Sequence, residues 1–373
     1  MSSPSNFGFG EEEQALRDAA RKFLTEQLPT DRLHRLVAAR DASGPAWEPA
    51  LWRQMGELGW TGVGVPERCG GVGMSTVAAV ALAEEAGRAA LPSPLIGTLQ
   101  ASAVLAACGS SAADALLAEI AQGESVALAI TGQRGAWRGD ACDVEYRDGA
   151  LHGMAYWVQD AAKAGVFLVK ARGATGAGLY AVRAAAPGLA VLPDAIVDLT
   201  RDQGRVSLEA VPAVELAPPG AAAAAIAAAE PALFTLVAAD LCGAAEWLLQ
   251  TTAEYARVRQ QFDRQIGFFQ AVKHPLVDAM IAIDSARSHV YNAAAAIDHD
   301  PATALRAAHM AKAAASDAAT FGASRAVQFH GGIGFTWECY VQVYFKRQLH
   351  NASLFGDAAW HRASLADVLF AAA

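Results

Sequence analysis

What this sequence lacks excludes several classes of protein. The five cysteines are dispersed and form no CxxC pair, which argues against a zinc site or a disulfide framework and indicates reduced thiols. There are 29 Lys and Arg residues against 38 Asp and Glu, a net charge of −9, so we expect no nucleic-acid partner. The sequence also has no metal-ligand spacing, nucleophile elbow or P-loop.

Signals for export or membrane insertion are absent as well. The N-terminal residues do not combine a basic segment with an apolar run, as a secretory signal would. The most apolar stretch, Ala221 to Ala245, is mostly alanine and is interrupted by Glu230-Pro231 and Asp240, so we expect no membrane span. With 53% hydrophobic and 18% charged residues among 373, the composition predicts a soluble cytoplasmic protein of two or three domains.

The hydrophobic pattern divides the chain into three blocks. Residues 1–124 are predicted to be a helical domain, residues 125–217 a middle β domain, and residues 218–373 a helical bundle. Short strand-like runs at this spacing favour a barrel or a sandwich. The helices expected in the first block span Gly10 to Leu28, Pro49 to Leu58 and Thr76 to Ala90, and one more helical stretch runs through Leu105 and Leu116 to Gln122. The expected strands span 126–130, 151–158, 166–171, 179–182 and 206–208.

The last block carries two polar clusters at the ends of helix-forming sequence. In the first cluster, Arg257, Arg259 and Arg264 offer guanidinium forks that suit phosphate groups, and Gln270 can both donate and accept hydrogen bonds. The second cluster begins at Gln328. We expect the two to face each other across a helical hairpin and to bind a nucleotide.

Three glycines follow Gln328. Gly331, Gly332 and Gly334 permit positive φ and a close approach of a ligand to the backbone. A glycine pair is also a common helix ending, so Gly331-Gly332 has an ordinary interpretation as a C-cap. His274 and His330 lie beside the two clusters and are candidates for contact with the same ligand, but for a lone histidine a structural role is favoured.

These residues resemble a known family. Arg259-Gln-Gln-Phe262-Asp-Arg-Gln-Ile266 with Gln270, followed by Gln328-Phe-His-Gly331-Gly332-Ile-Gly334, closely resembles the C-terminal signatures of the acyl-CoA dehydrogenases. The resemblance implies an α+β fold with an N-terminal helical domain, a middle β-barrel and a C-terminal four-helix bundle. It also implies FAD as cofactor, with Arg259, Phe262, Gln270, Gln328, Gly331 and Gly332 holding the ADP half of an FAD that belongs mainly to the neighbouring subunit. Asp263 departs from the pattern, because the family usually has Gly there.

The family's catalytic carboxylate has no counterpart in this sequence. The resemblance places the usual base at Phe355, before Gly356, and the alternative base of another branch at Leu233. Neither side chain can accept a proton, so we predict no catalytic residue in this chain.

Three nearby acids are possible replacements. Asp357 is more simply a solvated cap, Glu338 a structural ion-pair acid, and Glu230 the start of a helix ahead of Pro231.

The N-terminal side of the family's flavin site is only partly present. Thr131 follows the first expected strand, but the Gly-Ser-Asp segment of the family is missing. Trp157-Val-Gln159 resembles the family strand whose Trp lies against the flavin ring, while ordinary core packing of Trp157 is the competing interpretation.

The imbalance between the two sites suggests a heteromer. The residues that serve a neighbour's FAD are present, whereas the residues that would complete this chain's own site are missing. The sequence is similar to subunits of bacterial heterotetrameric steroid-degrading acyl-CoA dehydrogenases. This resemblance implies a second dehydrogenase subunit carrying the catalytic Glu, an acyl-CoA substrate such as a steroid side chain, and electron-transfer flavoprotein as acceptor. A flavin monooxygenase or oxidase of the same fold, and a non-catalytic stabilising subunit, are the alternatives.

Overall fold

The N-terminal helices form where apolar residues recur on one face. The computed structural model describes residues 6–39 and 45–370. The three helices with expected bounds are confirmed to within two residues at each end, whereas the short helix over Thr30–Ala38 was not predicted. The further helical stretch expected through Leu105 and Leu116 is present as two helices, Leu95–Cys108 and Ser111–Ala121. The elements of this region are α1 (Glu11–Gln27), α2 (Thr30–Ala38), α4 (Pro49–Glu57), η1 (Glu67–Cys69), α5 (Thr76–Arg88), α6 (Leu95–Cys108) and α7 (Ser111–Ala121).

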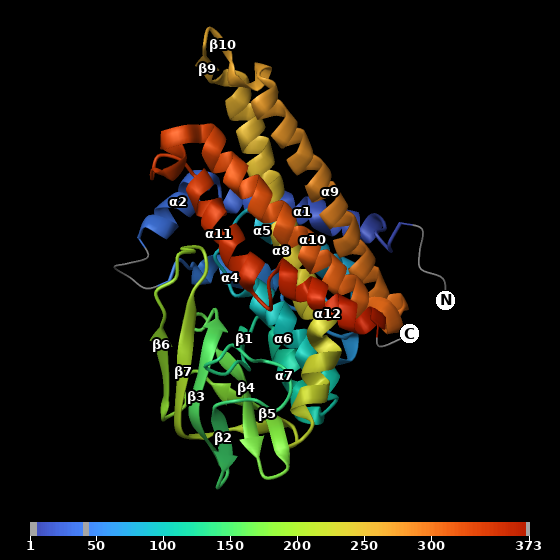
Figure 1. Ribbon diagram of the computed structural model, residues 1–373. Coiled ribbons are helices and arrows are strands. Elements are labelled where there is room, and N and C mark those ends of the chain that lie inside the picture. Colours follow the sequence, from blue (N-terminus) through green and yellow to red (C-terminus); the bar gives the residue numbers. More distant parts are fainter. Residues whose placement is uncertain (1–5, 40–44, 371–373) are drawn as a thin grey trace.

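The middle of the chain forms one eight-stranded sheet below the helices (Figure 1). Its hydrogen-bonded path runs β6-β7-β3-β2-β4-β5-β8, with β1 pairing to β4, and in the described part of the chain no pairing joins the end strands β6 and β8. In this respect it differs from a closed barrel. All five expected strands are present, and the remaining three are short. The strands are β1 (Val126–Ala129), β2 (Val144–Arg147), β3 (Ala150–Gln159), β4 (Val166–Gly173), β5 (Gly176–Arg183), β6 (Leu189–Pro193), β7 (Gln203–Pro212) and β8 (Val214–Ala217).

The C-terminal region is a bundle around one long helix, α8 (Ala222–Val258). α8 continues through Pro231, so Glu230 lies inside this helix and does not start one, contrary to the expectation. Alanines on both sides favour the helix, and the Thr235 hydroxyl donates to the carbonyl of Pro231 at 2.6 Å. The other elements are β9 (Gln260–Gln261), β10 (Arg264–Gln265), η2 (Ile266–Phe268), α9 (Gln270–His299), α10 (Pro301–His330), η3 (Gly331–Phe335), α11 (Val341–Ser353) and α12 (Ala358–Phe370).

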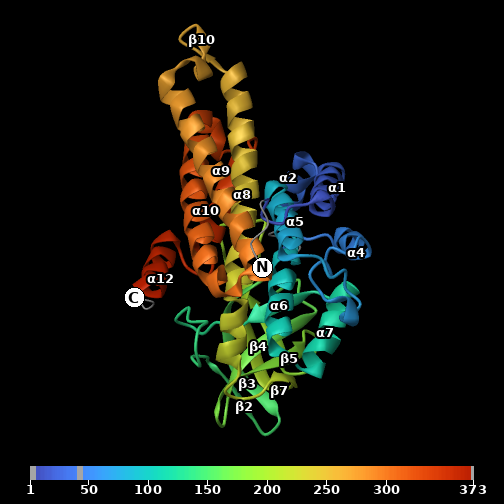
Figure 2. The same cartoon turned by 90° about the vertical axis from the view of Figure 1, so that its right-hand side faces the viewer.

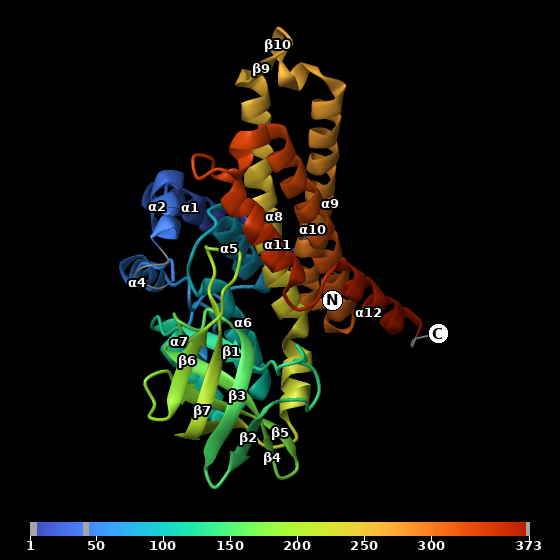
Figure 3. The same ribbon diagram turned by 60° about the vertical axis from the view of Figure 1, so that its left-hand side comes forward.

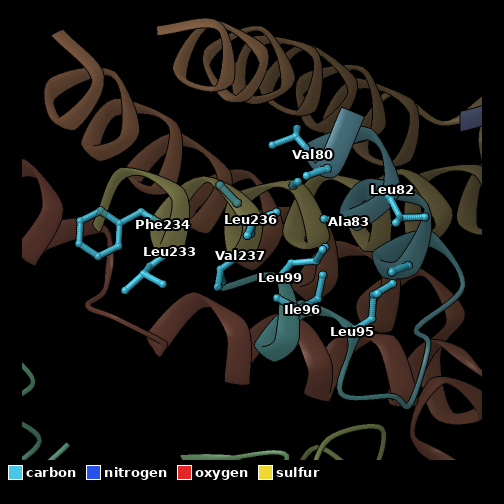
Figure 4. Packing of buried hydrophobic residues seen from close by; sticks show 14 of the residues in the cluster. Val80, Leu82, Ala83, Leu95, Ile96, Leu99, Leu233, Phe234, Leu236 and Val237 are labelled. Atoms are coloured by element: carbon cyan, nitrogen blue, oxygen red, sulfur yellow. The ribbon is translucent and has the colours of Figure 1, made fainter. Parts of the chain in front are cut away.

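α8 lies at the centre of the larger apolar core. It packs against α5 and α6 with Leu233, Phe234, Leu236 and Val237 directed into a shared apolar cluster (Figure 4). Its composition and length would allow it to cross a membrane, but 72% of its most apolar window is buried inside the protein, as in a core helix. Figures 2 and 3 show the upper ends of α8 and α9 extending beyond the neighbouring helices.

A buried charge network connects the bundle to the loop that precedes β7. The carboxylate of Asp240 on α8 accepts hydrogen bonds from Arg347 at 2.9 and 2.5 Å, from Arg201 at 2.9 Å and from Asn351 at 2.7 Å. Four donors around one buried carboxylate offset the cost of removing it from water. The network therefore fixes α8, α11 and the sheet relative to one another.

Candidate functional site

The first polar cluster lies at the tip of the α8–α9 hairpin (Figure 1). α8 ends at Val258, Arg259 is its C-cap, and β9 and β10 form a two-residue hairpin turn at Phe262 and Asp263. Both turn residues have positive φ, +55° and +57°. Such turns favour glycine or Asn at these positions, and the family's Gly would relieve the strain at Asp263.

The side chains of this cluster are exposed. Phe262 is 85% exposed and Arg259, Arg264 and Gln270 also face solvent. The guanidinium of Arg264 lies over the ring of Phe268, 4.3 Å from its centroid. A large exposed aromatic beside several cations is an uncommon surface for a lone chain.

The second cluster follows α10. Gln328 is exposed near the end of the helix, and Gly331 has φ +64°, which favours glycine. Gly332 needs no such conformation, and a side chain added there would meet nothing within 4 Å. The C-cap interpretation therefore accounts for Gly331 but not for Gly332, whose open side leaves room for a ligand outside the chain.

The ends of α8 and α10 meet through one stacked pair of rings. Tyr255 at the end of α8 stacks on His330 at the end of α10 with ring centroids 4.3 Å apart. His330 is buried and its Nδ1 lies 2.8 Å from the Ala326 carbonyl, so its role is structural, and burial lowers its pKa. His274 is exposed on α9. The helices α9 and α10 that connect the two clusters pack against each other as a hairpin.

The residues predicted on the N-terminal side line a separate pocket of about 350 Å³. Thr131 and Trp157 lie on its wall, together with Trp137, Gln159 and Phe355. Trp157 is 50% exposed, which rules out ordinary core packing, and its indole Nε1 donates to the Gln133 carbonyl at 3.2 Å. The flat aromatic walls and the polar rim suit a planar heteroaromatic ring.

Successive hydrogen bonds between side chains form the polar rim of this pocket. The Gln159 amide nitrogen donates to the Gln203 side-chain oxygen at 2.7 Å, and the Gln159 oxygen lies 2.7 Å from His350 Nε2. His350 and Gln203 were not predicted as site residues, because they come from α11 and β7, far from Gln159 in sequence.

Both family base positions lie at this pocket or behind it. Phe355 lines it, and Leu233 is fully buried, with its carbonyl accepting a hydrogen bond from the Gln100 amide at 2.9 Å. Phe355 has φ +54°, a strained conformation for a bulky residue. The Lys312 Nζ helps to hold this loop by donating to the carbonyls of Ala352 and Gly356, and burial lowers the pKa of Lys312 to about 7.

None of the three candidate replacement acids is placed as a free base in the pocket. Asp357 is exposed and accepts from the Trp360 backbone N–H at 2.8 Å, which makes it a helix cap. Glu338 is exposed and does not line the pocket. Glu230 is buried and paired with Arg138 at 2.5 and 2.7 Å.

The pocket and the hairpin tip are far apart within one chain. A helix rises about 1.5 Å per residue, so the stretch of α8 from Leu233 to Arg259 spans roughly 39 Å. One dinucleotide cannot touch both places in the same chain. The residues at the tip fit the phosphates and the adenosine of an FAD, and the pocket fits a flavin ring, but the two halves would belong to different FAD molecules.

Comparison with known proteins gives consistent matches. Residues 10–124 match the family model for the acyl-CoA dehydrogenase N-terminal domain, and residues 235–370 match that for the acyl-CoA dehydrogenase C-terminal domain. The chain is 33% identical to the acyl-CoA dehydrogenase IpdE2 of Mycobacterium tuberculosis, over 92% of this chain and 93% of that protein.

Two solved structures are similar along almost the whole chain. A variant of the Tcur3481-Tcur3483 steroid ACAD has a TM-score of 0.87 and 30% identity, covering 98% of this chain and 99% of that one. The ChsE4-ChsE5 complex from Mycobacterium tuberculosis has a TM-score of 0.85 and 26% identity, covering 97% and 98%.

Proposed function

Because this chain belongs to the acyl-CoA dehydrogenase family, whose members are FAD-dependent flavoproteins, we propose that it is the subunit of a heteromeric dehydrogenase that lacks the catalytic base. The assembled enzyme removes hydrogen from the α and β carbons of an acyl-CoA thioester. A second dehydrogenase subunit supplies the carboxylate, and this chain completes the FAD site of that subunit.

The separation of the two half-sites is the observation that carries the proposal. Arg259 is exposed at the tip of the α8–α9 hairpin, roughly 39 Å from the chain's own pocket if measured along α8, and Gln328 and Gly332 are exposed at the end of α10. A dinucleotide held in this chain's own pocket could not reach Arg259, which supports a ligand held mainly by another subunit.

Each residue of the two clusters has a defined role toward that FAD. Bound FAD supplies the acceptor for the hydride from the β carbon. Arg259 neutralises phosphate charge, Gln270 and Gln328 hydrogen-bond to polar groups, and Gly331 and Gly332 let the backbone approach. Phe262 offers its exposed ring to the adenine. Asp263 opposes the phosphates and weakens binding.

In the proposed heteromer the partner subunit, and not this chain, removes the α-proton. Removal of that proton needs a desolvated Asp or Glu within hydrogen-bond reach. At the two family positions this chain has Phe355 and Leu233, and Glu230, the buried one of the three candidate acids, is paired with Arg138. The partner's carboxylate therefore does this work beside the partner's flavin.

The similar heteromers suggest the substrate class. One similar structure is a steroid ACAD and another is a complex of two different ChsE chains, and both match this chain over nearly its whole length. By this analogy the acyl group is bulky, such as a steroid side chain. Electron-transfer flavoprotein is the proposed acceptor, and the cytoplasm the proposed location.

Coexpression with a second dehydrogenase subunit that carries the catalytic carboxylate tests the proposal. The pair is expected to hold FAD and reduce a dye with acyl-CoA, whereas this chain alone holds little FAD and has no activity. Arg259→Ala or Gln328→Ala in the pair should weaken FAD binding by about one to two decades, or about 1.5–3 kcal/mol. Arg53→Ala removes an exposed arginine elsewhere and serves as control.

Other outcomes identify the alternatives. Unchanged flavin content in the Arg259 and Gln328 variants would indicate a non-catalytic scaffold. Oxygen consumption with a hydroxylated product would indicate a monooxygenase. A lone chain that is fully flavinated and active would refute the proposal.

A further inference from the structure

A cavity of about 790 Å³ lies where the three blocks of the chain meet. Val37 on α2 comes from the first block, Val191 on β6 from the second, and Trp337 after η3 from the third. Ligand sites are common at such junctions between domains, in cavities of roughly 300–1,000 Å³. We refer to this space as the Trp337 cavity.

The Trp337 cavity is distinct from the pocket that Trp157 and Phe355 line. Of the described residues, only Gln203 lines both spaces. The Gln203 side chain spans the wall between them. Its oxygen accepts from Gln159 on the pocket side at 2.7 Å, and its amide nitrogen donates to Asp194 on the cavity side at 3.3 Å. A ligand in the cavity therefore needs no part in dehydrogenation.

Apolar side chains form most of the wall of the Trp337 cavity. Ile196 and Leu199, from the loop between β6 and β7, supply branched aliphatic surface. Short side chains keep the space wide, at Ala161, Ala162, Ala164, Ala184 and Ala195. An engineered cavity of about 150 Å³ holds one benzene, so a volume about five times larger admits several fused rings.

The carboxylates on the wall already have partners within the chain. Asp194 accepts from the Arg205 guanidinium at 3.1 Å. Asp202 accepts from the Ala162 backbone N–H at 2.8 Å and lies 2.9 Å from the Lys163 ammonium. Neither cation is among the described residues of the wall, so an anionic ligand would face like charge. A neutral molecule would break none of these hydrogen bonds.

Trp337 offers the cavity a flat apolar surface. It is 48% exposed, although two neighbours hold its ring in place. His34 on α2 meets the ring edge-on at a centroid distance of 5.4 Å, and the Lys346 ammonium lies over it at 5.6 Å. A fixed, half-exposed indole gains buried area when a ring system packs on it.

We propose that the Trp337 cavity is a second ligand site, which binds a neutral fused-ring molecule of steroid size and excludes carboxylate and CoA derivatives of such molecules. Contacts here are mainly apolar and not directional. A rigid ring system therefore binds better than a flexible chain of equal area, because it loses less conformational entropy. This inference goes beyond the proposed function and does not depend on it.

Two steroid derivatives of matched size test the preference for a neutral ligand. Testosterone hemisuccinate carries one carboxylate, and its methyl ester is neutral. Each is titrated into the full chain without FAD, and tryptophan fluorescence reports binding. We expect the ester to bind saturably, one per chain, and the acid to bind about tenfold more weakly because of the wall carboxylates.

Three variants locate the site. Ala195→Trp fills the cavity from an exposed position and should weaken binding of the ester by about tenfold or more. Ala302→Trp, exposed at the start of α10 and outside the lining, is the matched control and should keep the wild-type affinity. Asp194→Asn removes one negative charge from the wall and should narrow the difference between acid and ester.

Three results would overturn the inference: no saturable binding of the ester, equal affinity for acid and ester, or wild-type affinity in Ala195→Trp. Displacement of the ester by the partner subunit would also overturn it, because a protein segment would then occupy the cavity. None of these readouts measures flavin content or turnover, so failure here is distinguishable from failure of the proposed function.

Discussion

Asp263 is the residue at which this chain departs most plainly from a phosphate-binding surface. Asp263 has φ +57° at the second position of a tight turn, and in the sequence it lies between Arg259 and Arg264. Asp263→Gly should tighten FAD binding by the heteromer several-fold and stabilise the chain by about 1 kcal/mol, because it removes a like charge and relieves the backbone. Flavin fluorescence titration at low and high salt measures the first effect, and denaturant unfolding the second.

The matching substitution separates the two causes. Asp263→Asn removes the charge but retains a side chain at the same φ. It should reproduce the gain in affinity, which salt then reduces, without the full gain in stability. Equal FAD affinity in all three proteins would contradict the assignment of this turn to a phosphate-facing role.

The buried pair His309–His361 makes the chain sensitive to acid. Their Nδ1 atoms lie 2.8 Å apart, and burial lowers the pKa of His309 to about 4 and that of His361 to about 3. The unfolded state binds protons at about pH 6.5, before the folded state does, so stability falls as pH falls from about 6.5 toward 4. We expect a loss of a few kcal/mol over this window in urea titrations.

His361→Gln should flatten that dependence, because one of the two titrating groups is removed. His299→Gln, at an exposed histidine near the end of α9, should leave the wild-type slope unchanged. A wild-type slope in His361→Gln would show that other groups cause the acid sensitivity.

Residue identity indicated part of the candidate site. The arginines of the first cluster and the glycines of the second were evident because each motif is local. The cluster of aromatic rings beside the pocket was not evident. Its members come from four segments that only the tertiary fold brings together: Trp137, Phe234, Phe355 and Trp360. Lys312 gave no signal either, because a lysine in a helix is usually exposed.

Between elements, α5 and α8 cross closely at Gly87 and Gly243. A side chain added at Gly243 would overlap the Glu84 carbonyl, and one added at Gly87 would overlap that of Asp240. Gly243→Ala should therefore destabilise the chain by about 1–3 kcal/mol or more, as overpacked cores do. Chemical denaturation of the purified chain measures the change.

Gly322 on α10 offers the matched control. It is helical, and a side chain added there meets nothing within 4 Å. Gly322→Ala should be neutral or stabilising by up to about 1 kcal/mol through helix propensity. A loss similar to that of Gly243→Ala would indicate that packing at the crossing is not the cause.

The elements that escaped prediction have short or weak patterns. α2 spans nine residues and buries only Leu33 and Val37 fully, one helical turn apart. β2 buries only Val144. β6 is an edge strand with no fully buried residue. Long periodic segments such as α1 were predicted closely because many residues support the same period.

For the whole molecule, exposed aromatics indicate where a partner covers the chain. Phe262, at the tip of the α8–α9 hairpin, is 85% exposed, and Phe335, in η3 after α10, is 72% exposed. Phe262→Ser with Phe335→Ser should weaken the heteromer by about 2–4 kcal/mol if the two rings are anchors of the interface. Analytical ultracentrifugation of the mixed subunits over a dilution series gives the dissociation constant.

Phe370→Ser is the control for this change. Phe370 is 78% exposed but lies at the end of α12, away from the tip. It should leave the dissociation constant unchanged. A heteromer that survives loss of both phenylalanines with wild-type affinity would exclude this surface as the interface.

Three-part architecture could be predicted from sequence because apolar periodicity changes at the two transitions. How the parts are fastened could not. The Asp240 carboxylate, the Arg347 guanidinium and Arg201 come from distant segments, and a charged residue inside an apolar helix gives no information about its partners.

The length of α8 has a consequence for the history of such an enzyme. Because Leu233 and Arg259 lie roughly 39 Å apart along α8, a substitution at Phe355 or Leu233 leaves the tip of the α8–α9 hairpin intact. After gene duplication, selection can maintain one end while mutation erodes the other. Two once-equal copies would then become mutually dependent through complementary losses, and neither could return to solitary catalysis by a single reversion.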